Sequence, residues 1–95
     1  MADKEANTWK RHVINSVEEF RAGAVYEIPA LRRTGSWSWK VHEVSEGGLI
    51  FSKVNGSSGG NLFWDERPGA STYDDQNRTV RQLVEDGEVV EVQPP

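Results

Sequence analysis

The sequence of 95 residues contains no cysteine, which excludes disulfides and thiolate metal sites. It has no apolar run approaching the roughly 18 residues that a membrane-spanning helix requires. The stretch MADKEANTWKRH also lacks the apolar segment of a signal peptide. We therefore expect a cytoplasmic protein without membrane contact.

Motifs for catalysis and for metal binding are missing as well. His12 and His42 lie far apart in the chain without ligand spacing between them. The glycine-rich stretch GSSGG has neither the lysine nor the strand-to-helix context of a phosphate-binding loop. The sequence therefore predicts a non-enzymatic protein with no cofactor and no metal. The enzymatic hypothesis that stays open is a small enzyme around His42, with Asp65 or Glu66 as its acid–base partner.

Acidic residues exceed basic ones, and the excess is confined to one half of the chain. The net charge is −4, but residues 1–42 carry seven Lys and Arg against five Asp and Glu, whereas residues 43–95 carry four against ten. This asymmetry permits a basic face on an acidic protein. It argues against non-specific binding along a nucleic-acid backbone, because such binding needs many cationic contacts to phosphate.

What the chain does have is aromatic side chains and alternating strand patterns. Four Trp, three Phe and two Tyr supply much of the surface that a domain of this size can bury, at about 150–250 Å² each. Strand composition, alternation and turn residues predict extended segments at 24–29, 36–44, 49–54, 61–65 and 88–92. The middle strands are joined by short turns and should be sequential neighbours in an antiparallel sheet.

Two interpretations compete for residues 8–23. Trp9, Val13, Val17 and Phe20 recur at helical spacing and favour one long helix. Alternatively, residues 12–14 form a short strand, and the capping box that begins at Ser16 starts a two-turn helix. Both interpretations bury Phe20 and end at Gly23, and the apolar stripe favours the long helix.

Together these elements predict one α+β domain over residues 8–93, preceded by a frayed terminus at 1–7. Its centre would be a small curled antiparallel sheet or an SH3-like barrel of 4–5 strands, with an N-terminal helical segment and one C-terminal helix. That last helix would begin at Asp74 or Asp75 and run to about Asp86, with Val80, Leu83 and Val84 inward.

The stretch GSWSWKVHEV raises the question of what its two tryptophans do. Alternation places Trp37, Trp39 and Val41 on one face of a strand and Lys40 and His42 on the other. A small domain needs its large aromatics for burial, which favours a core role. The functional alternative keeps Trp37 at the rim of a groove, where its ring could stack on a ligand.

Phe63 and Trp64 are adjacent, so in a strand they face opposite ways and one of them leaves the main core face. We expect the protein to be a binding module for a protein or peptide, with an aromatic sheet face edged by basic residues. The candidate partner-binding residues are Arg32, Arg33, Trp37, Lys40 and Trp64. Lys53 would join the basic patch.

The alternative hypothesis is a nucleic-acid-binding regulator that uses the same face, with cations for phosphate and flat rings for bases. Within it, a winged-helix variant would use residues 75–92, although the mixed charge of that helix suits groove binding poorly. A homodimer through an unpaired strand edge is also compatible with the pattern, which does not identify the edge.

Overall fold

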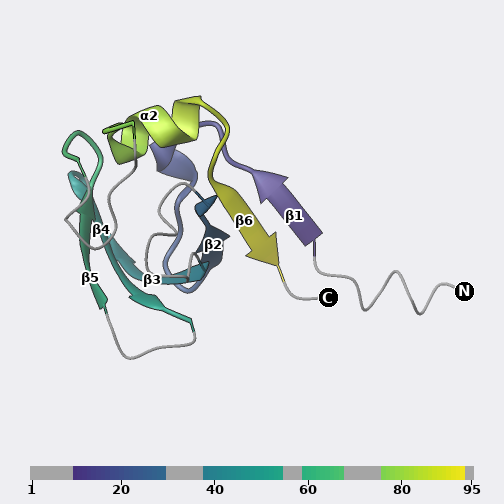
Figure 1. Cartoon of the computed structure of the whole chain (residues 1–95). Helices are drawn as coiled ribbons and strands as arrows, with labels where there is room; N and C mark the ends of the chain where they lie inside the picture. The colour runs from purple at the N-terminus through teal and green to yellow at the C-terminus, as the bar shows by residue number, and fades with distance from the viewer. Residues whose placement is uncertain (1–9, 30–37, 55–58, 68–75, 94–95) are drawn as a thin grey trace, which may run out of the picture.

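The computed structural model describes residues 10–29, 38–54, 59–67 and 76–93. Within these ranges the chain forms six strands, one short α-helix and one 3-10 turn (Figure 1). In chain order they are β1 (Lys10–Val13), η1 (Val17–Glu19), β2 (Val25–Glu27), β3 (Ser38–Val44), β4 (Gly48–Lys53), β5 (Gly59–Phe63), α2 (Val80–Glu85) and β6 (Val90–Gln93). In the described part of the chain, no helix has the length and apolar character needed to cross a membrane.

All six strands belong to one antiparallel sheet with the order β1-β6-β2-β3-β4-β5. The sequential pairing of β2 through β5 confirms the prediction made from the short turns. The SH3-like barrel is wrong, because the described strands leave the sheet open, with β1 and β5 at its two ends (Figure 1). The last strand, β6, lies between β1 and β2 and supplies a pairing that local pattern did not predict.

The long N-terminal helix is also wrong, and the alternative of a strand followed by a short helix is nearly right. The backbone of β1 pairs with β6 along its whole length, from Lys10 opposite Gln93 to Val13 opposite Val90. Ser16 then caps η1 by accepting a hydrogen bond from the backbone N–H of Glu18 at 3.2 Å. Only one 3-10 turn follows. Partner strands far along the chain, rather than local spacing, thus decide this segment.

The C-terminal helix is present but shorter than expected. Thr79 caps α2, and its hydroxyl and the side chain of Gln82 form a reciprocal capping box. Residues 76–79 are not helical, so the start predicted at Asp74 or Asp75, which lie outside the described residues, is wrong. Gly87 has a φ of 74°, in the left-handed region that commonly ends helices.

The core lies between one face of the sheet and α2, which crosses one end of it (Figure 1). Val80, Leu83 and Val84 are buried on the helix, as predicted. On the sheet, Trp39 meets Phe51 edge-to-face with ring centroids 4.5 Å apart. After Val41 a β-bulge shifts the register of β3 against β4, which interrupts the alternation near the end of the strand. We call the sheet face opposite this core the outer face.

Glu19 at the end of η1 is held as a charged carboxylate by two donors. Its Oε2 accepts a hydrogen bond from the backbone N–H of Asn15 at 2.7 Å, and its Oε1 lies 3.0 Å from Nε2 of His12. These bonds, first the one from Asn15 and then the one from His12, lower the pKa of Glu19 below its ordinary value.

We expect Glu19→Gln to change how stability depends on pH. Because the folded pKa of Glu19 is lowered, the stabilisation by its charge is fully present above the ordinary carboxyl pKa, roughly 4.3. It is lost as the pH falls through the folded value. Urea titrations should therefore show the largest difference between the two proteins near neutral pH, with convergence in acid. A difference that stays constant across this range would contradict the assignment.

Gly48 is required because β4 and β5 approach each other closely at this position. A Cβ atom at residue 48 would lie 2.1 Å from the carbonyl oxygen of Leu62 and 2.9 Å from the Cα of Phe63. Both are backbone atoms of β5, so relieving the overlap requires the two strands to separate.

Gly48→Ala is therefore expected to lower the free energy of unfolding by about 1–3 kcal/mol, the usual cost of forcing extra atoms into a packed region. The neighbouring Gly47→Ala is a matched control, because a Cβ there meets nothing within 4 Å. We expect the control to stay within about 0.5 kcal/mol of the parent in chemical denaturation. Equal losses for the two variants would show that the close approach is unimportant.

Candidate functional site

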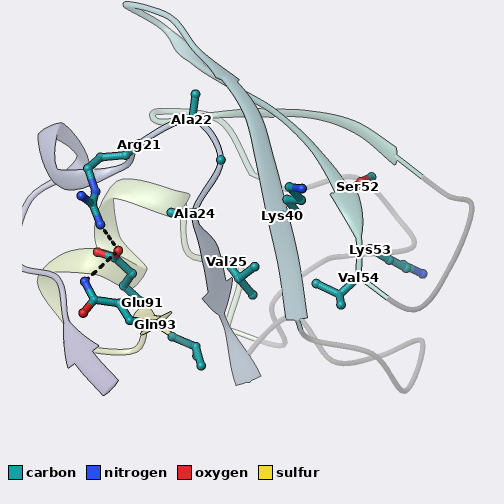
Figure 2. A pocket seen from close by; sticks show the side chains of 12 residues that line it. Arg21, Ala22, Ala24, Val25, Lys40, Ser52, Lys53, Val54, Glu91 and Gln93 are labelled. Carbon is teal, nitrogen blue, oxygen red and sulfur yellow. Dashed lines mark hydrogen bonds and ion pairs between the residues drawn. The ribbon is translucent and has the colours of Figure 1, made fainter. Parts of the chain in front are cut away.

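An open groove lies beside β2, between the segment that precedes this strand and the facing parts of β3, β4 and β6 (Figure 2). Its volume is about 890 Å³. The described residues that line it are Arg21, Ala22, Gly23, Ala24, Val25, Lys40, Ser52, Lys53, Val54, Glu91, Val92 and Gln93. We call it the cationic groove, because three of these residues are basic and one is acidic.

Small residues at the entry to β2 explain why the surface is hollow here. The run Ala22, Gly23 and Ala24 carries almost no side-chain volume. Hydrogen bonds to β3 hold this run in place: Gly23 N donates to Val41 O at 2.8 Å, and Val41 N donates to Ala24 O at 3.0 Å. Gly23 has a φ of 87°, which a residue with a side chain rarely adopts. The turn therefore stays small and fixed.

At one end of the groove, Arg21 and Glu91 form an ion pair, which Figure 2 shows as a dashed line. Glu91 is only 4% exposed, whereas the Arg21 side chain remains largely in solvent. The amide of Gln93 donates a second hydrogen bond to Glu91 Oε2 at 3.2 Å. The hydrogen bond to Glu91 and its charge raise the pKa of Arg21, so this guanidinium stays protonated at every physiological pH.

The buried side chain of Tyr26 holds the backbone next to the groove in place. Its hydroxyl accepts a hydrogen bond from the backbone N–H of Arg21 at 2.8 Å and donates one to the carbonyl of Glu19 at 3.2 Å. Burial is the main cause that raises the pKa of Tyr26, so its hydroxyl stays neutral. The position of Arg21 is thus set both by its backbone and by its side chain.

The other side of the groove carries two lysines on neighbouring strands. Lys40 of β3 is exposed. Lys53 of β4 is placed opposite Trp39, with its Nζ 5.9 Å from the centre of the indole ring, at the distance of a cation–π contact. Ser52 is the register partner of Lys40 on β4. Its hydroxyl lies 2.6 Å from Nε2 of His42.

Valines supply the apolar part of the groove. Val25 of β2 stands between Lys40 on one neighbouring strand and Val92 on the other. Val54, directly after β4, is 55% exposed. These three valines continue into an adjoining depression of about 300 Å³, whose lining includes Arg11 and Glu27, themselves an ion pair. Apolar surface and charge are therefore interleaved across the outer face.

The residues predicted as a site from the sequence do not all meet. Lys40 and Lys53 are both among the residues that line the cationic groove. Trp64 is buried elsewhere, stacked on Phe20 with ring centroids 5.3 Å apart, and its indole N–H donates to the carbonyl of Glu46 at 3.0 Å. The other three predicted residues, Arg32, Arg33 and Trp37, lie outside the described residues.

Sequence reasoning did not propose Arg21 or Glu91 as site residues. They are 70 positions apart, so no spacing relates them, and only the pairing of β6 with β2 brings them together. One signal was available: a glutamate inside the apolar run EVVEV needs a cation if its position is buried.

The histidine hypothesis finds a different partner from the one expected. His42 contacts Ser52, whereas Asp65 accepts a bidentate hydrogen bond from Arg81, at 2.7 and 3.2 Å. The Arg81 hydrogen bond lowers the pKa of Asp65. In the described segments no carboxylate hydrogen-bonds His42. Among those same residues, no group of three or more His, Cys, Asp or Glu is placed to hold a metal ion.

We expect Arg21→Ala to lower the free energy of unfolding more than Arg11→Ala does. Each arginine neutralises one carboxylate, but the side chain of Glu91 is 6% exposed and that of Glu27 is 21% exposed. A carboxylate buried without its cation destabilises the fold more than one that water can reach. Chemical denaturation at neutral pH measures both losses, and a larger loss for Arg11→Ala would contradict this view of Glu91.

The chain was compared with protein families, curated proteins and solved structures. No protein family model, no curated protein and no solved structure matches the chain.

Proposed function

We propose that the protein is a non-enzymatic binding module that holds an acidic peptide segment of a protein partner in the cationic groove. The observation that carries the proposal is the composition of the groove: its lining combines exposed valine surface with Lys40, Lys53 and Arg21, and Arg21 is fixed by Glu91. As part of the same proposal, the module is cytoplasmic, as expected from the sequence.

The chemistry of an extended peptide suits such a lining. Successive side chains of an extended segment point in opposite directions, so alternating apolar and acidic residues can place one set on Val25 and Val54 while the other reaches Lys40. Cations at the rim mainly attract and orient the partner, and the apolar contacts slow its release.

The described lining favours a peptide over nucleic acid. Single-stranded nucleic acids are usually held by flat rings that stack on bases, with cations that follow the phosphates. No aromatic side chain is among the described residues that line the groove. The net charge of −4 also opposes binding along a polyanion. Binding of nucleic acid is therefore the alternative outcome of the experiment described below.

A charge reversal at Lys40 tests the proposal, with a fluorescein-labelled decapeptide of alternating valine and glutamate as the probe. We expect fluorescence anisotropy to detect binding that weakens as salt rises, because exposed charges are screened. Lys40→Glu should weaken this binding about tenfold or more, a loss of about 1.4 kcal/mol. Lys40 is exposed, so the variant should retain the fold.

Arg67→Glu is the matched control, because it makes the same change in net charge at an exposed residue that does not line the groove. It should leave the affinity for the peptide close to that of the parent. Equal weakening by both variants would reduce the effect to net charge and contradict a specific groove. Binding of an oligo-dT probe in place of the peptide would favour the nucleic-acid alternative.

A further inference from the structure

The two end strands of the sheet differ in how they are protected. The edge strand β1 carries Lys10 and Arg11, charges that oppose pairing with another copy of the same strand. The opposite edge strand, β5, reads Gly-Gly-Asn-Leu-Phe and has no charged residue, no proline and no register irregularity against β4. Charged residues, prolines and bulges normally prevent edge-to-edge association, so among the described strands their absence from β5 marks it as the edge able to pair.

The hydrogen bonds between β5 and β4 determine which backbone groups of β5 point away from the sheet. Trp64 N donates to Gly47 O at 3.0 Å, which makes residues 64 and 47 a hydrogen-bonded pair. In an antiparallel ladder the bonded pairs alternate, so residues 60 and 62 also turn their N–H and C=O toward β4. The backbone groups of Gly59, Asn61 and Phe63 therefore point away from the sheet.

The outward-facing residues Gly59, Asn61 and Phe63 can pair with the same three residues of a second copy. If two β5 strands pair antiparallel about Asn61, each Asn61 faces its counterpart and each Phe63 faces Gly59 of the second copy. All three positions then form hydrogen-bonded pairs. Phe63 is 46% exposed, and a strand glycine leaves a gap that a cross-strand aromatic ring can cover. Nothing larger than glycine fits at position 59, because a Cβ there would lie 2.7 Å from Phe51 O.

We propose that β5 is a homodimerisation edge: two copies of the chain join their sheets through antiparallel β5 strands centred on Asn61. A second copy is favoured over an unrelated strand because this register sets each exposed Phe63 ring opposite Gly59 of the other copy, and no like charges meet within it. The contact buries the exposed face of Phe63 beside Ile50, which is 39% exposed on the same outer face. This proposal is independent of the cationic groove, which β5 does not line.

Two variants that place opposite charges at position 61 test the proposal. Asn61 is exposed, and in the proposed dimer it would face Asn61 of the second copy across the two-fold axis. Sedimentation velocity over a range of concentrations should show that the parent protein self-associates. Asn61→Lys and Asn61→Glu should each weaken this association about tenfold or more, since like charges directly opposite destabilise paired strands. An equimolar mixture of the two variants should regain the association, now between unlike copies.

Val13→Lys serves as the control, because it adds a cation at the exposed β1 edge and should leave self-association unchanged. Circular dichroism of all variants should match that of the parent. The proposal is overturned by a parent that stays monomeric at millimolar concentration, by Asn61 variants that associate as well as the parent, or by a mixture that does not recover. Loss of association in Val13→Lys alone would assign the contact to β1 and also overturn it.

Discussion

The pairing of β6 with both β1 and β2 is the constraint on which the rest of the molecule depends. This strand joins the segment before the first turn to the four-stranded meander that follows. Glu91 of this strand stands opposite both His12 and Tyr26, and it is buried although it is charged. The ion pair with Arg21 therefore neutralises a carboxylate at the junction of the two parts and also places a cation at the surface groove.

Sequence reasoning recovered the elements whose signals are local. The strands around Trp39 and Phe51, the tight turn before Gly48 and the apolar face of α2 follow from alternation, turn residues and helical spacing. It failed where partners distant in the chain decide the outcome. Residues 10–13 lie in a stretch, 8–23, whose apolar residues are spaced as in a helix, but pairing with β6 makes them a strand. The closed barrel was wrong for the same reason, since strand patterns do not show which ends meet.

The candidate site was less predictable than the fold. A lysine that alternates with tryptophans can be placed on the solvent face of a strand, and Lys40 is indeed exposed there. The small residues before β2 and the glutamate in β6 have no relation in the sequence, so the groove that they share was not foreseen. The adjacency of Phe63 and Trp64 correctly indicated that one of the two rings leaves the core, but it did not show which. Phe63 is the exposed ring, and Trp64 is buried.

The origin of the groove lining has a thermodynamic consequence. Its side chains come from four separate segments of the chain, so the groove exists only when β6 is in place. The unfolded chain has no such surface, and a ligand of the groove therefore binds the native state alone. Occupancy then raises the apparent stability by an amount that grows with ligand concentration relative to Kd. Folding of the chain and binding of a ligand in the groove are therefore linked equilibria. An increase in melting temperature would report that a ligand is bound even when the chemical identity of the ligand is unknown.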